Sequence, residues 1–264
     1  MFRLVATLFI SIVLFSCSSS PDQEKSSPKK EAKTQVKEKA TTQKKAEPKE
    51  EKYPTLTNET VVDFMKEYGK KNPETLVRLE TEYGNVKIRL YENTPIHRAN
   101  FIYLTKRKYF DQTQFYRVAK EFVCQAGNSD DWETQYTRKD IGMYTLPAEL
   151  PKENVHTYGA VAAARSYNDN PEKLSSPYEF YIIMGPTFNE PTMRIYGKEY
   201  NVEYSPEQIE LYGTIGGQPS LDQQHTVFGE VIEGMDVIEE INKVEVDSRE
   251  WPNKEIPIKV RIAE

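Results

Sequence analysis

Tyrosine and tryptophan are confined to one part of the chain, which limits where a folded core can form. All 17 tyrosines and both tryptophans lie at or beyond Tyr53, whereas residues 18–52 contain neither an aromatic residue nor a glycine. A segment so rich in Lys and Glu cannot bury enough apolar surface to offset the entropy lost on ordering. We therefore expect residues 17–52 to be a disordered tether. The remaining 212 residues suffice for one large domain or two small ones.

Net charge excludes some classes of function. Residues 18–52 hold ten lysines and seven acidic residues, and the whole chain carries −6, so residues 53–264 carry about −10. An acidic folded part would repel phosphates, so we expect no nucleic-acid partner. Lysines and acids are interleaved in the tether, which favours a solvated linker over a basic patch. No apolar run of 18 residues follows the N-terminus, which excludes a polytopic membrane protein.

The N-terminus carries an export pattern. Arg3 precedes the apolar run Leu4–Phe15, which is too short to span a bilayer comfortably but fits a secretory signal peptide. The run ends at Ser16-Cys17, which resembles a bacterial lipobox, where the Cys becomes the acylated first residue. We expect residues 1–16 to be a lipoprotein signal peptide and Cys17 to be lipidated. The alternative is an ordinary signal peptide in which Cys17 is incidental.

A lipid on Cys17 would hold the chain at a membrane surface without spanning it. The expected location is the cell envelope, anchored to a bacterial membrane and facing the periplasm or the cell surface. A tether of this length typically spans roughly 30–35 Å, so the domain could work away from its anchor. Cys124 is then left without a disulfide partner, and its apolar neighbours Phe122 and Val123 indicate a buried, inert thiol.

Hydrophobic periodicity predicts one helix and then many strands. Residues 58–71 are expected to form a helix capped by Asn58 within an N-terminal extension, residues 53–74, that packs on the domain. From Thr75 the period becomes two, and a hairpin turns at residues 83–85. Further strands are expected at 114–118, 121–125, 159–164, 179–184, 226–231 and 258–262, and helices at 96–106 and 235–241. About eight short strands indicate an all-β barrel or sandwich, and a barrel leaves no exposed sheet edge.

Residues 187–219 interrupt this rhythm. Ser205-Pro206 followed by Gln208 marks the start of a helix. We interpret the segment as an insertion that decorates one domain; a weaker alternative is that it binds a specific partner and the barrel is its scaffold.

The sequence contains no pattern typical of a metal site or of a serine nucleophile. His97, His156 and His225 are scattered without the spacing of metal ligands, and no G-x-S-x-G motif occurs. We therefore expect neither a metal nor another cofactor. Arg117 and Gln125 stand out because they interrupt two strongly apolar strands, although an arginine there could simply be solvated.

The segment from Phe115 to Asn128 resembles the signature strand pair of the cyclophilins, peptidyl-prolyl cis–trans isomerases, whose pattern is F-H-R-V-x-x-x-F-M-x-Q-G-G-D. Three further segments follow in the family's order: Ala163-Ala164-Arg165 for M-A-N, Glu179–Ile182 for Q-F-F-I, and Leu221–Gly229 for L-D-x-x-H-x-V-F-G. The resemblance covers about residues 75–264 apart from the insertion. It implies a closed eight-stranded antiparallel barrel capped by helices, with the site on its outer face.

The resemblance also implies roles for individual residues. Arg117 would donate to the twisted amide, Gln125 would orient Arg117, and His225 would sit on the pocket rim. The residues implied to contact substrate are Phe122, Val123, Tyr181 and Leu221, which would line the proline pocket, and Ala164 and Arg165, which would lie along the peptide groove. Isomerisation needs an apolar pocket and a fixed donor rather than a nucleophile or metal, because the barrier is amide resonance.

Two departures from the family pattern bear on the site. Glu179 stands where the family has Gln, and we expect its carboxylate to pair with Arg117 and restrain it. Tyr181 stands where the family has Phe and adds a hydroxyl to the pocket floor.

The leading hypothesis is a lipid-anchored monomeric isomerase that assists folding of exported, proline-containing polypeptides, with the membrane contacted only through its lipid. The alternative is a proline-peptide-binding module or holdase with little turnover.

Overall fold

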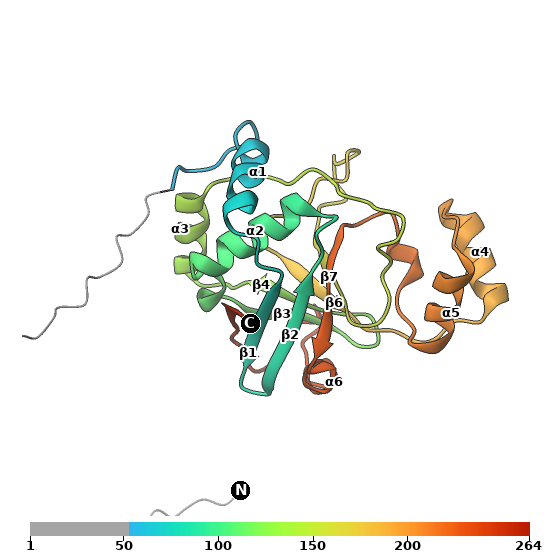
Figure 1. Ribbon diagram of the computed structural model, residues 1–264. Helices are drawn as coiled ribbons and strands as arrows, with labels where there is room; N and C mark the ends of the chain where they lie inside the picture. The colour runs from blue at the N-terminus through green and yellow to red at the C-terminus, as the bar shows by residue number, and fades with distance from the viewer. Residues whose placement is uncertain (1–52) are drawn as a thin grey trace, which may run out of the picture. The chain divides into compact units, whose positions relative to one another are not determined.

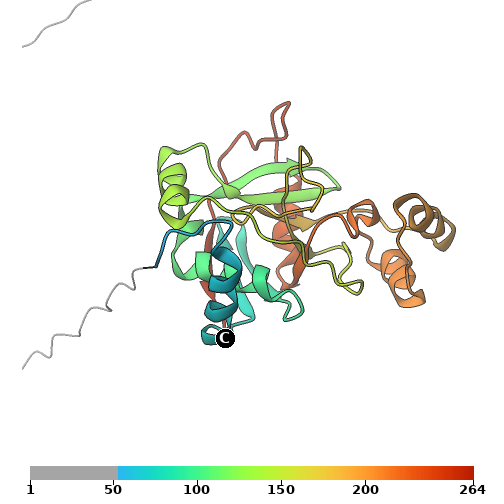
Figure 2. The same cartoon turned by 90° about the horizontal axis from the view of Figure 1, so that it is seen from above.

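A computed structural model of the protein describes residues 53–264, drawn in colour in Figures 1 and 2. The expected signal peptide, Cys17 and the tether lie outside the described residues. Within 53–264 the chain forms eight strands and six α-helices. The strands are β1 (Leu76–Thr81), β2 (Gly84–Leu90), β3 (Gln114–Ala119), β4 (Val123–Asn128), β5 (Ala160–Ala163), β6 (Phe180–Ile183), β7 (Val227–Glu233) and β8 (Lys259–Ile262). The helices are α1 (Val61–Lys71), α2 (Pro95–Lys106), α3 (Trp132–Ile141), α4 (Glu190–Tyr200), α5 (Pro206–Thr214) and α6 (Met235–Asn242).

All eight strands belong to one strongly curled antiparallel sheet, which confirms the predicted fold class. Its order is β3-β4-β6-β5-β7-β2-β1-β8. At the two ends of this order, β3 contacts the segment just before β8 over a short stretch rather than through a full ladder: Gln114 and Pro257 form an isolated bridge, beside the hydrogen bond from Phe115 N to Ile256 O at 3.0 Å. The predicted barrel is therefore closed only at this short seam.

Each predicted strand overlaps an observed one. The predicted β1–β2 hairpin is present, but it turns at Glu82 and Tyr83, and Gly84 and Asn85 already pair with β1. Alternation of side chains gives the sheet two apolar faces. The inner face forms the main core, where Phe101 from α2 meets Phe110, Phe180 and Phe228 with ring centroids 4.8–5.5 Å apart. A second, smaller apolar cluster lies on the other face of β4, β5 and β6 and includes Val123, Ala162 and Tyr181.

Helix α1 packs against α2, as Figure 1 shows. Phe64 and Tyr68 of α1 lie against Tyr103 of α2 with ring centroids 5.2 Å apart, and Met65 is fully buried. The prediction that Asn58 caps this helix is wrong. Thr60 occupies the cap position, and Asn58 Oδ1 instead accepts a hydrogen bond from Thr145 N at 2.8 Å.

Helices α3 and α4 were not predicted from the sequence. Helix α3 buries only Thr134 and Ile141, so it has no apolar stripe of helical period. Helix α4 buries only Met193 and contains Gly197, a weak helix former. The predicted start of α5 is confirmed, because Ser205 and Gln208 form a reciprocal capping box. Helices α4 and α5 project to one side of the curled sheet (Figure 2).

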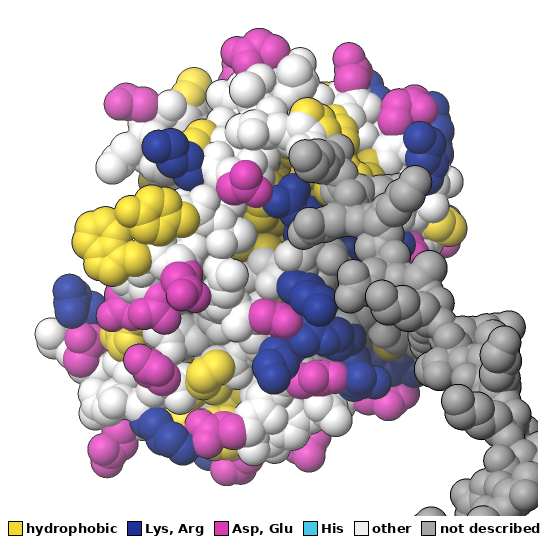
Figure 3. Space-filling model, turned by 90° about the vertical axis from the view of Figure 1, so that its left-hand side faces the viewer, with side chains coloured by type: hydrophobic (Ala, Val, Ile, Leu, Met, Phe, Trp, Pro, Cys, Tyr) yellow, Lys and Arg dark blue, Asp and Glu magenta, His cyan; other side chains and the backbone are white. Residues whose placement is uncertain are grey.

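Figure 3 shows the side of the molecule on which α1 and α3 lie in Figure 1. Acidic and basic side chains are mixed across this face, and hydrophobic side chains gather at one margin. Helix α3 carries two of the most exposed aromatic side chains, Trp132 at 79% and Tyr136 at 67%. Within residues 53–264, none of the helices combines the length and apolar character needed to cross a membrane.

Burial of Met65 predicts that α1 is part of the cooperative core. Met65→Ala should lower the free energy of unfolding by about 2–5 kcal/mol, because it removes a fully buried side chain and leaves a cavity. Urea unfolding measures the change. The neighbouring, exposed Lys66→Ala is the matched control and should shift stability by less than about 0.5 kcal/mol. Equal stability of the two variants would show that α1 is not part of the core.

Candidate functional site

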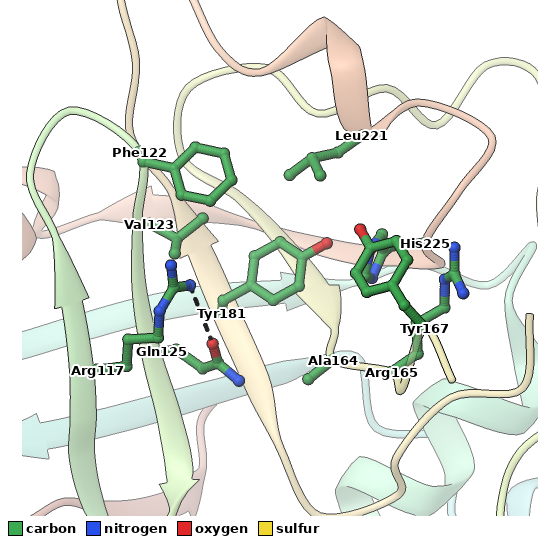
Figure 4. Close-up of a pocket in the computed structure, with 10 residues that line it drawn as sticks. All are labelled: Arg117, Phe122, Val123, Gln125, Ala164, Arg165, Tyr167, Tyr181, Leu221 and His225. Carbon is green, nitrogen blue, oxygen red and sulfur yellow. Dashed lines mark hydrogen bonds between the residues drawn. The ribbon is translucent and has the colours of Figure 1, made fainter. Parts of the chain in front are cut away.

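All nine residues that the sequence suggested for catalysis and substrate contact line a single pocket of about 370 Å³. A tenth residue, Tyr167, completes the lining (Figure 4). The pocket lies over the smaller apolar cluster, on the face of the sheet opposite the main core. Strands β3, β4 and β6, the segment after β5 and the segment before β7 therefore converge there.

A β-bulge sets the direction of Arg117. Phe115 pairs with Ala126 and Arg117 pairs with Gln125, so Tyr116 is an extra residue in β3. Phe115 and Ala126 point into the main core, whereas Arg117 and Gln125 line the pocket. The bulge shifts the alternation by one residue, which lets β3 keep Phe115 buried and still direct its arginine to the outer face.

The guanidinium of Arg117 is held from two sides. Its Nη1 donates to Gln125 Oε1 over 3.5 Å, a long hydrogen bond drawn as a dashed line in Figure 4. Its Nη2 lies 2.8 Å from Glu250 Oε2. The guanidinium carbon also lies 5.8 Å from the centre of the Phe122 ring. The charged donor therefore sits at the border between the apolar pocket and a carboxylate.

Glu250 belongs to the segment between α6 and β8. Its backbone carbonyl accepts from Val118 N at 2.8 Å, and its φ of +64° is a left-handed conformation. The neighbouring Trp251 packs against Tyr116, with ring centroids 5.9 Å apart. These contacts fasten the segment to β3 beside the arginine.

The expectation that Glu179 pairs with Arg117 is wrong. Glu179 Oε1 instead lies 3.2 Å from Arg138 Nη2, and its Oε2 accepts from the Tyr116 hydroxyl at 3.2 Å. Arg138 lies on α3, which the sequence did not predict, and its Nη2 also donates to Gly127 O of β4 at 2.9 Å. Gln125 Nε2 donates to the Tyr116 hydroxyl. Glu179 therefore acts on Arg117 only indirectly, by helping to fix the Gln125 amide.

His225 is buried, with 7% of its surface exposed. Its Nδ1 lies 3.1 Å from Ala163 O, so this nitrogen carries the proton and donates to the carbonyl. Nε2 is then an acceptor, and the Tyr167 hydroxyl lies 2.7 Å from it as the donor. Burial, reinforced by His156 nearby, lowers the pKa of His225 to about 4. The imidazole is therefore neutral near pH 7.

The pocket floor and walls are mostly apolar. Tyr181 is 5% exposed, and its hydroxyl lies 3.3 Å from His156 Nε2. Burial raises the pKa of Tyr181 well above its usual value, so the phenol stays protonated. Val123 is buried beside it, and the half-buried Phe122 and Leu221 lie above it in Figure 4.

Ala164 and Arg165 form the far side of the pocket. Ala164 N donates to Glu179 O at 3.0 Å, which continues the β5–β6 edge. Arg165 Nε donates to Gln224 O at 2.7 Å, and its guanidinium lies 4.2 Å from the centre of the Tyr167 ring. Tyr167 itself is 66% exposed. Arg165, Tyr167 and His225 thus form one stacked, hydrogen-bonded wall.

Sequence reasoning missed Tyr116, Tyr167 and Glu250. The bulge at Tyr116 could be predicted only from the requirement that Phe115 and Arg117 lie on opposite faces of the sheet. Tyr167 and Glu250 lie in irregular segments, so no periodic pattern marks them. Among residues 53–264, no group of three or more His, Cys, Asp or Glu side chains is arranged to hold a metal ion.

Comparison with known proteins gives a consistent result. Residues 76–262 match the family model described as cyclophilin type peptidyl-prolyl cis-trans isomerase/CLD. A Staphylococcus epidermidis protein assigned to the peptidyl-prolyl cis-trans isomerases is 29% identical over 186 residues, covering 70% of this chain and 89% of that protein. The Arabidopsis thaliana peptidyl-prolyl cis-trans isomerase CYP18-2 is 27% identical over 183 residues, covering 69% of this chain and 89% of that protein.

The fold agrees with solved structures. A Cryptosporidium parvum cyclophilin type peptidyl-prolyl cis-trans isomerase, crystallised in the presence of the dipeptide Ala-Pro, superposes with a TM-score of 0.51 at 21% identity, covering 72% of this chain and 99% of that one. At this identity the likeness speaks for the fold alone. The family match covers most of the chain, and so this chain belongs to the cyclophilin-type peptidyl-prolyl cis–trans isomerases.

Proposed function

We propose that the chain accelerates rotation about X-Pro bonds in exported polypeptides, with Arg117 as the donor to the twisted amide and the apolar pocket as the seat of the proline ring. The observation that carries this proposal is the convergence of all nine suggested residues on one pocket, with the arginine at its edge. The activity itself follows from family membership; the residue roles and the exported substrates are the proposal.

The chemistry needs little from the protein. Rotation about an amide meets a barrier of about 18–20 kcal/mol, because resonance stiffens the C–N bond. The twisted state has lost this resonance, so any donor that is better placed for it than for the planar amide lowers the barrier. Arg117 presents a planar, permanently charged group of five donors beside the pocket. No bond to a side chain is made or broken.

Each remaining lining residue then has a simple role. Gln125 orients Arg117, and Phe122, Val123, Tyr181 and Leu221 surround the ring. Ala164 and Arg165 contact the substrate backbone. His225 packs on the rim as a neutral imidazole, since its low pKa and occupied nitrogens remove it as a base.

The proposal also places the protein in the cell envelope of a bacterium, anchored through acylated Cys17. The support is the sequence Ser16-Cys17 after an apolar run, followed by a segment without aromatic residues. On this view the clients are polypeptides that fold after export.

One observation favours the alternative, a binding module with little turnover. The ion pair with Glu250 occupies one terminal nitrogen of Arg117, and a restrained donor could bind proline peptides without following the twisting amide. An isomerisation assay on an X-Pro peptide separates the two: binding at an uncatalysed rate would support the module.

Arg117→Ala should lower kcat/KM for an X-Pro peptide by about 10²- to 10³-fold, the usual cost of removing one transition-state donor. A protease-coupled or NMR exchange assay measures it. Arg89→Ala is the matched control. Arg89 of β2 forms an ion pair with Glu230 of β7 and does not line the pocket, so this variant should keep the wild-type rate. If Arg117→Ala keeps the wild-type rate, the assignment of the donor is wrong.

Glu250→Gln should lower kcat by roughly 2- to 5-fold with little change in KM, because Arg117 loses its closer anchor, and partly exposed ion pairs contribute weakly. Glu245→Gln, an exposed residue of the same segment, is the control. A rise in kcat would instead show that Glu250 competes with the substrate for Arg117.

His225 should titrate near pH 4 rather than 6.5, and kcat/KM should stay flat from about pH 6 to 8. Because the pKa of His225 is lower in the folded state, the unfolded state binds more protons between pH 6.5 and 4. The contribution of His225 to stability is therefore lost as the pH falls through that window. NMR of the imidazole nitrogens measures the midpoint, and an activity step near pH 6.5 would contradict the neutral role.

Mass spectrometry of the mature protein should find an acylated N-terminal Cys17. The Cys17→Ala variant should carry no lipid. A mature N-terminus beyond Cys17 would remove the anchor from the proposal without affecting the isomerase site.

A further inference from the structure

A buried chain of hydrogen bonds runs from the inserted segment to the proline pocket. Tyr212 on α5 donates from its hydroxyl to Asp222 Oδ2 at 2.6 Å. Asp222 Oδ1 accepts from the backbone N of His156 at 2.7 Å and lies 2.8 Å from His156 Nδ1. His156 Nε2 then lies 3.3 Å from the Tyr181 hydroxyl in the pocket floor. Tyr212, Asp222 and His156 are each 0% exposed, and Tyr181 is 5% exposed.

The Asp222 carboxylate receives three donors: the Tyr212 hydroxyl, the backbone N of His156 and the proton on His156 Nδ1. On the other side of the ring, His156 Nε2 and the Tyr181 hydroxyl lie within hydrogen-bond distance of each other. Burial raises the pKa values of Tyr181 and Tyr212, so both phenols keep their protons near neutral pH. Every link therefore joins a donor to an acceptor.

His156, in the middle of these hydrogen bonds, also packs against two residues that line the pocket. The His156 ring is stacked on Tyr181 with centroids 6.2 Å apart and meets the edge of His225 at 6.3 Å. Asp222 directly follows Leu221, which lines the pocket. A second link from the insertion is the Tyr204 hydroxyl, which donates to Pro219 O at 3.1 Å at the start of the turn that carries Leu221.

We propose that Tyr212, Asp222 and His156 are positioning residues for the isomerase site, and that the inserted segment thereby helps to fix the floor and wall of the proline pocket. This inference rests on the proposed function of that pocket. Tyr212 is not among the residues that line the pocket, and its hydroxyl is linked to the pocket through Asp222 and His156. The insertion is then part of how the pocket is built rather than a decoration of the barrel.

The test is a double-mutant cycle between the two ends of the chain of hydrogen bonds. Tyr212→Phe removes one hydroxyl and keeps the ring, and it should lower kcat/KM for an X-Pro peptide by roughly 3- to 10-fold, mainly through KM. In the Tyr181→Phe background the same change should cost less than about twofold, because the hydrogen bond that joins His156 to the pocket floor is already cut. Tyr196→Phe is the control: Tyr196 lies on α4, packs on Phe188 and Tyr200, and should leave kcat/KM unchanged.

Equal losses from Tyr212→Phe in both backgrounds would overturn the proposal, as would an unchanged kcat/KM with an intact fold. A readout that needs no variant is the His156 tautomer in the wild-type protein, from long-range ¹H–¹⁵N NMR. A proton on His156 Nδ1 supports the proposal, and an Nδ1 without a proton refutes it.

Failure of the proposed function would be distinguishable from failure of this inference. If the wild-type protein does not accelerate isomerisation, the function is wrong. The affinity for a fluorescent proline peptide then replaces kcat/KM in the same cycle. A Tyr212-dependent affinity that disappears in the Tyr181→Phe background would still support positioning, and an affinity independent of Tyr212 would refute it.

Discussion

Alternation of side chains along β4, β5 and β6 is the constraint on which the pocket depends. Cys124 and Ala126 enter the main core, whereas Val123 and Gln125 between them reach the outer face. The same alternation puts Phe180 and Ile182 inside and Tyr181 outside. Because the inner set is locked by packing, the outer set is locked with it, and a slip of one residue would exchange the two faces. The site is thus held by the core without being part of it.

The strands could be predicted because a strand that turns one face to the core alternates apolar and polar side chains along its length. The same reasoning fails for α3, which buries only two residues and shows no apolar stripe. That omission also explains the error over Glu179. Without α3 nothing in the sequence brings Arg138 to Glu179, and Arg117 was the arginine that the family resemblance placed at the site. The true partner, Glu250, lies 133 positions beyond Arg117 in an irregular segment, so only tertiary structure brings them together.

Electrostatics around Arg117 follows from the acidity of the folded part. Residues 53–264 carry about −10, and Arg117 is paired with one of these carboxylates, that of Glu250. Glu250 binds Nη2, whereas Gln125, held by Tyr116, offers only a long hydrogen bond to Nη1. The neutral amide leaves the pocket side of the guanidinium less committed than the solvent side. A substrate carbonyl in the pocket would therefore meet guanidinium N–H groups that Glu250 does not occupy.

The buried carboxylate of Asp222 sets a further condition on the fold. A carboxylate removed from water is tolerated only when its oxygens accept several hydrogen bonds. Two of the three donors come from His156 before β5, and the third comes from Tyr212 in the inserted segment. Without that hydroxyl, Oδ2 would lose the hydrogen bond from Tyr212 at a fully buried position. The barrel and the insertion therefore share one buried polar group.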